Sequence, residues 1–149
     1  MRVSFEVVLQ KGRDEVWKAF DSTSNMKKWQ PTLRSFEPVS GTPGQVGAVS
    51  RLTYDERGRA MVLTETITLR RHPDAFAGTY ESGPAVNSIH NTFAVLSPGS
   101  TKWTMESEFC FRGFFKLMAP FMRSPISKRM RADMERFKTL LEAGELSGA

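Results

Sequence analysis

Hydrophobic and polar residues alternate in seven stretches of the chain, a pattern typical of β-strands with one buried face. In the first stretch, Val3, Phe5, Val7 and Leu9 occupy every second position. The other stretches are residues 33–39, 47–55, 60–71, 75–82, 86–96 and 101–111. Most of the connections are short and rich in Gly, Pro, Ser and Asp, so neighbouring strands are expected to pair antiparallel.

The longest of these stretches separates its two faces clearly. Between residues 60 and 71 the apolar positions are Met61, Leu63, Ile67 and Leu69, and Arg70 falls on the polar side with Val62 and several threonines. Trp103, Met105 and Phe109 alternate with Lys, Thr and Glu in the same way. The pattern predicts a sheet with one apolar face and one face in water.

The last forty residues offer a cover for the apolar face. Hydrophobic residues recur there at steps of three or four, which places them on one side of a helix; they are Phe115, Met118, Met122, Ile126, Met130, Met134, Phe137 and Leu141. Pro120 and Pro125 each remove a backbone donor, so we expect a kink or break before an uninterrupted helix at 126–143. Residues 144–149 are expected to fray.

Two shorter helices are predicted between the first two strands. Asp14 can cap a helix that ends near Phe20, and Ser22 or Ser24 can begin another that ends before Pro31. With about seven strands, these elements give an α+β fold in one domain over residues 1–149.

Composition excludes several classes of protein. Cys110 is the single cysteine among 149 residues and only two histidines accompany it, so neither an internal disulfide nor a thiolate-rich structural metal site is expected, and no cofactor is predicted. The sequence lacks a long apolar run, which predicts a cytoplasmic protein without a transmembrane segment. The net charge of +5 is dispersed along the chain.

The order of elements resembles that of the START-like (SRPBCC) superfamily, in its polyketide cyclase/dehydrase and lipid-transport branch. The resemblance covers nearly the whole chain and includes Glu15-Val16-Trp17, Trp29 before Pro31, the turn from Gly41 to Gly47, Thr64-Glu65-Thr66-Ile67 and Thr101-Lys102-Trp103-Thr104. It implies a helix-grip fold, in which a curved sheet wraps around the long C-terminal helix. It also implies a cavity between the two that holds a hydrophobic small molecule.

Glu65 is the candidate for chemistry, because it shares the apolar register of its strand. Burial would raise the pKa of its carboxyl, and a nearby arginine would lower it. It could act as an acid or a base toward a ligand, with Tyr80 or Asn91 assisting. A structural role, solvated at the sheet rim or paired with Arg51, is the alternative.

Other residues in the apolar register are expected to contact a ligand. His90 has the opposite parity and should face outward, and Ser107 lacks partners for a nucleophilic triad. The predicted binding residues are Leu52, Tyr54, Leu63, Glu65, Ile67, Phe76, Tyr80, Asn91, Phe93, Trp103, Met105, Met118, Met122 and Met130.

These features favour a carrier or sensor of a hydrophobic small molecule, such as a lipid, a polyketide-like aromatic or an isoprenoid. A polyketide cyclase, dehydratase or hydrolase that uses Glu65 is the second hypothesis. Nucleic acid is the least favoured partner, because aromatic residues are not interleaved with the basic ones on the last helix. A monomer or weak homodimer is expected.

Overall fold

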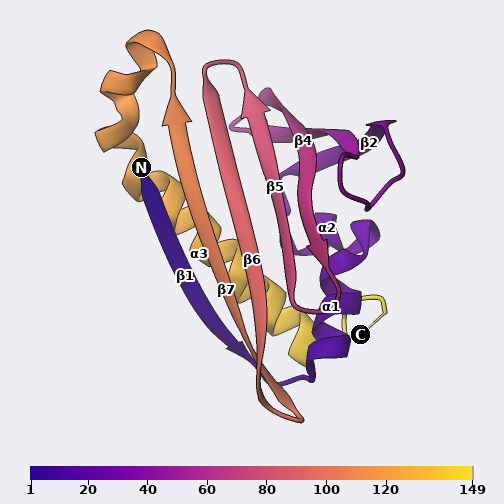
Figure 1. Ribbon diagram of the computed structural model, residues 1–149. Helices are drawn as coiled ribbons and strands as arrows, with labels where there is room; N and C mark the ends of the chain where they lie inside the picture. The colour runs from indigo at the N-terminus through magenta and orange to yellow at the C-terminus, as the bar shows by residue number, and fades with distance from the viewer. Residues whose placement is uncertain (149) are drawn as a thin grey trace.

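The computed structural model describes residues 1–148 and contains one seven-stranded antiparallel sheet. The strand order is β1-β7-β6-β5-β4-β3-β2, so every sequential pair from β2 to β7 is adjacent and β7 returns beside β1. The strands are β1 (Arg2–Leu9), β2 (Leu33–Ser40), β3 (Val49–Glu56), β4 (Arg59–Arg71), β5 (Ala75–Ser82), β6 (Ala85–Ser97) and β7 (Ser100–Phe111). The predicted α+β fold class, with a curved antiparallel sheet and a long last helix, is confirmed (Figure 1).

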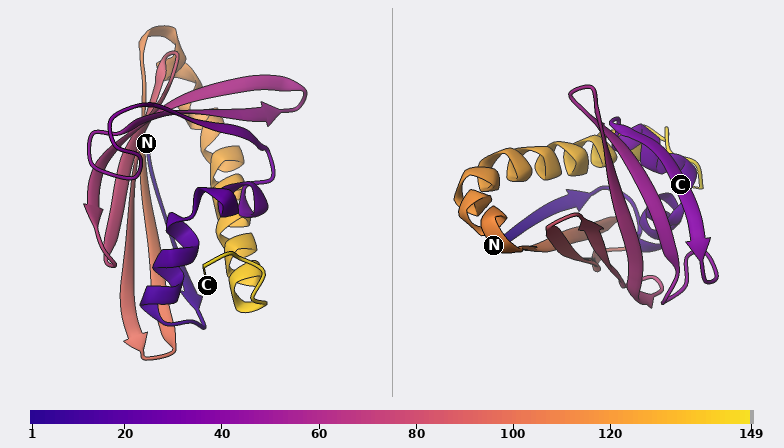
Figure 2. Two further views of the ribbon diagram at one scale, coloured as in Figure 1. Left: turned by 90° about the vertical axis from the view of Figure 1, so that its right-hand side faces the viewer. Right: turned by 90° about the horizontal axis from the view of Figure 1, so that it is seen from above.

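In the described part of the chain, four helical elements accompany the sheet: α1 (Arg13–Asp21), α2 (Thr23–Trp29), the 3₁₀ helix η1 (Gly113–Met118) and α3 (Ala119–Glu142). The two views of Figure 2 show that the sheet curves and that α1, α2 and α3 lie on its inner side. We call this side the concave face. It carries the apolar residues of each strand, because strand side chains alternate between faces.

Aromatic rings fill the core between the sheet and the C-terminal half of α3. Trp103 is fully buried, and its ring lies 5.1 Å from Phe137 and 5.7 Å from Phe20 between ring centroids. Trp29 and Phe93 complete the cluster at 5.9 and 6.2 Å from Trp103. Burial of rings of this size makes this half of α3 the part that fixes the helix to the sheet.

The last helix begins earlier than predicted. It starts at Ala119, with Pro120 in its first turn and Pro125 inside it, so the expectation of an uninterrupted helix only from residue 126 is wrong. A proline in the first turn costs no hydrogen bond, since those amides lack helical partners. Pro125 removes one bond in an exposed part of the helix. None of the helices within residues 1–148 combines the length and apolar composition needed to cross a bilayer.

A β-bulge in β4 changes the face of two residues. Ile67 pairs with Gly78 but Leu69 pairs with Ala77, so one extra residue lies on β4 between them. The alternation predicted through Leu69 therefore fails after Ile67. Arg70 pairs with Phe76 on the concave face, where its guanidinium binds Asp21 at 2.6 Å and lies over the ring of Trp17.

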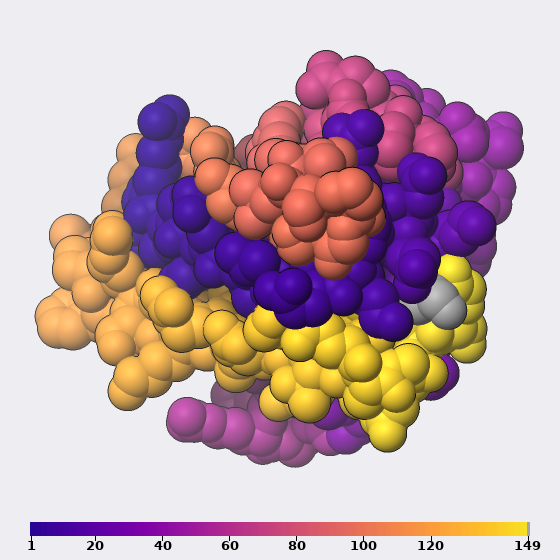
Figure 3. Space-filling model, turned by 90° about the horizontal axis from the view of Figure 1, so that it is seen from below, coloured from indigo at the N-terminus to yellow at the C-terminus, as the bar shows by residue number. Residues whose placement is uncertain are grey.

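Residues 144–148 pack against the first two helices rather than fraying. Leu146 is buried, and the Asn25 amide donates to the Ser147 carbonyl at 2.8 Å while accepting from the Ser147 amide at 2.9 Å. Residue 149 lies outside the described residues. Seen from below, α1, the β6–β7 turn and the end of α3 form a continuous surface over most of this end (Figure 3).

The two edge strands are β1 and β2. Along β1, the Lys138 ammonium of α3 donates to the Val8 carbonyl at 2.6 Å. Within residues 1–148, strand β2 has only β3 as a neighbour, and it contains Pro38 and register irregularities at Leu33/Ser35 and at Pro38/Ser40.

Candidate functional site

A row of polar side chains crosses the concave face. Ser50 on β3 pairs with Glu65 on β4, Glu65 pairs with Tyr80 on β5, and Tyr80 pairs with Asn87 on β6. Ser107 of β7 extends the row, since its hydroxyl lies 2.6 Å from the Asn87 side-chain oxygen. We call these five residues the polar row. They share a face because residues directly opposite one another on neighbouring strands point the same way.

Glu65 lies in the middle of the polar row and is 4 % exposed. Burial raises the pKa of its carboxyl, and the hydrogen bond that the Tyr80 hydroxyl donates partly opposes this rise. Burial and the neighbouring carboxylate raise the pKa of Tyr80 well above its usual value, so this phenol stays protonated and can donate a hydrogen bond at neutral pH. The alternative in which Glu65 pairs with Arg51 is wrong, because Arg51 pairs with Glu37 at 3.6 Å.

A second polar group lies where α3 approaches β3. The Tyr54 hydroxyl donates to the Gln30 side-chain oxygen at 2.6 Å, and the Arg129 guanidinium lies 5.3 Å from the centre of the Tyr54 ring. Arg129 also binds the Glu56 carboxylate and donates to the Thr32 hydroxyl at 2.6 Å. Burial raises the pKa of the Tyr54 phenol. Arg129 thus joins the middle of α3 to the end of β3.

Apolar side chains on the concave face and on the first half of α3 remain partly accessible. The accessible residues on the strands and on the first half of α3 are Met61, Leu63, Phe76, Ile89, Phe109, Met122, Ile126 and Met130, and Tyr80 is accessible to the same degree. Gly78 adds room among them, because a side chain there would begin 3.5 Å from the Tyr80 hydroxyl. The concave face therefore presents an apolar surface with a polar row across it.

Ten of the fourteen predicted binding residues fall into two sets. Leu52, Tyr54, Leu63, Glu65 and Tyr80 lie together on β3–β5, and Leu52, Tyr54, Leu63 and Tyr80 form one hydrophobic cluster with Leu33. Phe93, Trp103, Met105 and, in part, Phe76 and Met130 belong to the aromatic core cluster. Ile67 is buried next to Gly78, and Met122 is half-buried on α3.

Two of the predicted residues have other surroundings. Asn91 is buried, accepts a hydrogen bond from the Trp103 indole at 2.9 Å and donates to the Phe76 carbonyl at 3.3 Å. The fold therefore already uses its amide, which argues against a role in assisting Glu65. Met118 belongs to η1 and is 42 % exposed.

Sequence reasoning missed Asn87, Gln30 and two residues of α3. Asn87 has the same parity as Asn91 and Phe93, so register alone could have found it. Arg129 and Asp133 could not be found in this way. The pKa of Asp133 is raised by burial and held back by Arg129 and Arg136, which lie four residues before it and three residues after it on α3. The burial that raises this pKa depends on how α3 packs, which residue spacing does not show.

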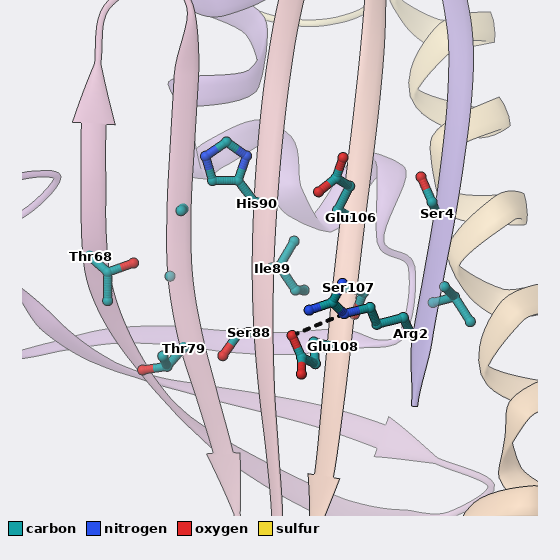
Figure 4. Close-up of a pocket in the computed structure, with 13 residues that line it drawn as sticks. Arg2, Ser4, Thr68, Thr79, Ser88, Ile89, His90, Glu106, Ser107 and Glu108 are labelled. Atoms are coloured by element: carbon teal, nitrogen blue, oxygen red, sulfur yellow. Dashed lines mark ion pairs between the residues drawn. The ribbon is translucent and has the colours of Figure 1, made fainter.

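A groove of about 530 Å³ lies on the opposite, convex face of the sheet. Figure 4 shows His90, Glu106, Ser88 and Thr79 on the side of the strands away from α3, with the Arg2–Glu108 ion pair at 3.4 Å among them. The outward position of His90 agrees with its parity. The groove is lined mainly by polar residues, together with Val3, Ala77 and Ile89, and Ser107 is the one member of the polar row that also lines it.

Among residues 1–148, no group of three or more His, Cys, Asp or Glu side chains could hold a metal ion. Cys110 is exposed and near the end of β7.

Comparison with known proteins gives a family match over nearly the whole chain. Residues 2–142 match the family described as polyketide cyclase / dehydrase and lipid transport. A search of curated proteins gave no significant match.

Solved structures with low sequence identity share the fold. The ZhuI aromatase/cyclase from a Streptomyces species superimposes with a TM-score of 0.80 at 15% identity, covering 95% of this chain and 93% of that one. A START superfamily protein from Mycobacterium smegmatis gives 0.78 at 11% identity over 95% and 97% of the two chains. The protein Ara h 8.0201 gives 0.77 at 15% identity over 96% and 98%.

Proposed function

Because this chain belongs to the polyketide cyclase/dehydrase and lipid transport family, we propose that it binds one hydrophobic small molecule on its concave face, as a carrier or sensor. The ligand class is a lipid, a polyketide-like aromatic or an isoprenoid. The observation that carries the proposal is the set of partly accessible apolar side chains that face α3 around the polar row.

The accessible apolar surface of the concave face would supply the binding energy. Side chains such as Leu63 and Phe109 point to the inner side of the sheet and are partly accessible. Covering such area with an apolar ligand gains about 25 cal/mol per Å² of apolar surface removed from water, and this gain opposes the cost of association. The polar row would orient the ligand, because its hydroxyl and amide groups can bond to one or two oxygens of the bound molecule.

Two adjacent residues of β4 give a direct test. Leu63 faces inward and is half-buried, whereas Val62 is 44 % exposed on the other face. We expect Leu63→Trp to fill the binding surface and weaken binding of the apolar dye 1-anilinonaphthalene-8-sulfonate by about tenfold. Val62→Trp, which adds the same indole outside, should bind as the wild type does. Equal affinity of both variants would show that the dye binds elsewhere and would contradict the proposal.

A co-purified ligand offers a second readout. Native mass spectrometry of the wild-type protein should show an added mass that organic extraction removes. The fraction of protein that carries this added mass should be lower in Leu63→Trp and unchanged in Val62→Trp. Thermal unfolding of both variants confirms that each is folded.

An enzymatic role is the second proposal, and the hydrogen-bonded Glu65–Tyr80 pair favours it. A neutral Glu65 could donate a proton to a ligand carbonyl while Tyr80 donates a hydrogen bond to the same oxygen. Such a pair suits cyclisation or dehydration of a polyketide-like chain, whose carbonyls need activation.

This role is tested with a poly-β-keto thioester as substrate. Glu65→Gln and Tyr80→Phe should each slow turnover by at least about a hundredfold, the usual contribution of a positioned acid. Dye affinity should change little in Tyr80→Phe. If the wild type and Glu65→Gln turn over the thioester equally, Glu65 has no catalytic role.

A further inference from the structure

One end of the molecule exposes a concentrated group of large hydrophobic side chains. Phe114 and Leu117 of η1 are 73 % and 66 % exposed, and Phe121 in the first turn of α3 is 76 % exposed. Phe115 and Met118 between them are also exposed. Single exposed apolar residues are ordinary, but five within eight consecutive positions mark an interaction surface.

Basic residues surround this group without acidic ones. Between Glu108 and Asp133 the sequence contains no Asp or Glu, and its basic residues are Arg112, Lys116, Arg123, Lys128, Arg129 and Arg131. Arg112, Lys116, Arg123 and Lys128 are exposed, and the ion pairs found among residues 1–148 involve none of these four. We call residues 112–128 the docking segment.

We propose that the docking segment binds the surface of an anionic lipid bilayer. Its Phe and Leu side chains would enter the boundary between headgroups and acyl chains, and its Lys and Arg side chains would remain among the lipid phosphates. This combination of protruding apolar residues and basic residues is the chemistry of helices that lie in a membrane interface. The segment projects from one end of the molecule, as the orange atoms of Figure 3 show.

The charge of the segment favours a bilayer over a second copy of the chain. Two docking segments packed against each other would bring their cations together with no carboxylate from either segment to neutralise them. An anionic bilayer supplies the opposite charge and an apolar layer at the same place. The docking segment shares Met122 and Ile126 with the binding surface proposed above, but Phe114, Leu117 and Phe121 are outside that surface, so substitutions there test membrane binding separately from ligand binding.

Vesicle sedimentation tests the proposal. The wild-type protein should sediment at low ionic strength with vesicles of phosphatidylcholine and phosphatidylglycerol, mixed roughly three to one to give a negative surface. Phosphatidylcholine vesicles should bind at least about tenfold less. Phe114→Ser with Phe121→Ser should weaken binding to the anionic vesicles at least about tenfold, since each ring loses its apolar burial.

A matched control lies at the opposite end of the sheet. Val95 and Leu96 are 55 % and 52 % exposed near the β6–β7 turn, so Val95→Ser with Leu96→Ser removes two exposed apolar side chains outside the docking segment. This control should bind vesicles as the wild type does. Lys116→Glu with Arg123→Glu should weaken binding at least about tenfold, because each basic residue contributes roughly fivefold before reversal.

Insertion of the docking segment into the bilayer can be measured separately from its electrostatic attraction to the bilayer surface. The native tryptophans Trp17, Trp29 and Trp103 are buried, so an indole introduced by Phe121→Trp should be the one quenched by brominated lipid. Leu96→Trp should not be quenched. If a double variant fails to fold, these single-tryptophan variants still show whether the docking segment enters the bilayer.

Three results would overturn the proposal. The first is no sedimentation of the wild type with anionic vesicles at low ionic strength. The second is equal binding by the wild type and a folded Phe114→Ser/Phe121→Ser variant. The third is a wild-type dimer that this variant converts to a monomer without vesicles present, since a second copy would then occupy the surface.

Discussion

The ionisable carboxyl of Glu65 has little contact with water. The Tyr80 hydroxyl is its hydrogen-bond donor, and Ser50 is its neighbour on the other side. A buried carboxyl favours its neutral form because transfer of the charge from water is costly. The raised pKa is therefore a property of the folded state and has a consequence for stability.

The free energy of unfolding should therefore depend on pH through Glu65. The neutral form of Glu65 contributes its full stabilisation below the unfolded pKa of about 4.5, and this is lost as pH rises through the higher folded value. Glu65→Gln remains neutral, so its free energy of unfolding should increase relative to the wild type as pH rises above about 4.5. Urea unfolding of both proteins over a pH series measures this difference.

Glu81→Gln is the control for this series. Glu81 is exposed, and as the next residue after Tyr80 it lies on the opposite face of the sheet. This variant should show no comparable gain. A constant difference between wild type and Glu65→Gln at all pH values would contradict the assigned environment of Glu65.

Residue parity predicted the face of Glu65, Tyr54 and Tyr80 because regular strands alternate strictly. It failed for Leu69 and Arg70, since the bulge inserts one residue and exchanges the faces beyond it. Nothing in the local pattern of residues 60–71 indicates this bulge. Its effect is visible only in the pairing with β5 and in the contact of Arg70 with Asp21.

At the level of elements, the two halves of α3 differ in how they pack against the sheet. The second half carries buried Met134, Phe137 and Leu141, which belong to the core. The apolar periodicity predicted this stripe, but it wrongly included Phe115 and Met118. Those two residues lie in a 3₁₀ helix with about three residues per turn, so the spacing of an α-helix does not apply to them.

Two phenylalanines on α3 should therefore respond differently to truncation. Phe137→Ala removes a fully buried ring and should lower the free energy of unfolding by about 3–5 kcal/mol. Phe121→Ala should change it by no more than about 0.5 kcal/mol, because the ring is exposed. Guanidinium unfolding measures both. A large loss in Phe121→Ala would mean that η1 and the start of α3 are packed parts of the fold rather than an exposed surface.

At the scale of the whole molecule, Arg129 joins two distant parts of the chain. Its contacts with Glu56, Thr32 and Tyr54 hold the middle of α3 to β3 and to the loop before β2. The order of strands follows from short connections and was predictable. A contact between residues 129 and 56 depends on where the finished helix lies across the sheet, so the sequence pattern gave no indication of it.

Loss of this contact should loosen one side of the binding surface. Arg129→Met should increase amide hydrogen exchange in β3 and lower the free energy of unfolding by about 1 kcal/mol, since the ion pair is only partly buried. Lys128→Met, at the exposed neighbouring position, is the control and should change neither. Unchanged exchange in β3 of Arg129→Met would show that the helix is held by its aromatic half alone.

The edges of the sheet determine how copies of this protein meet at high concentration. An open edge strand is a template on which another chain can add and begin a fibril. Pro38 has no amide hydrogen to offer such a chain, and the irregular register on either side of it breaks the regular repeat that a growing fibril needs. At the other edge, the Lys138 ammonium bonds to a backbone carbonyl of β1. Both margins are thus protected against strand-to-strand aggregation, although the middle of the sheet is long and rich in β-forming residues.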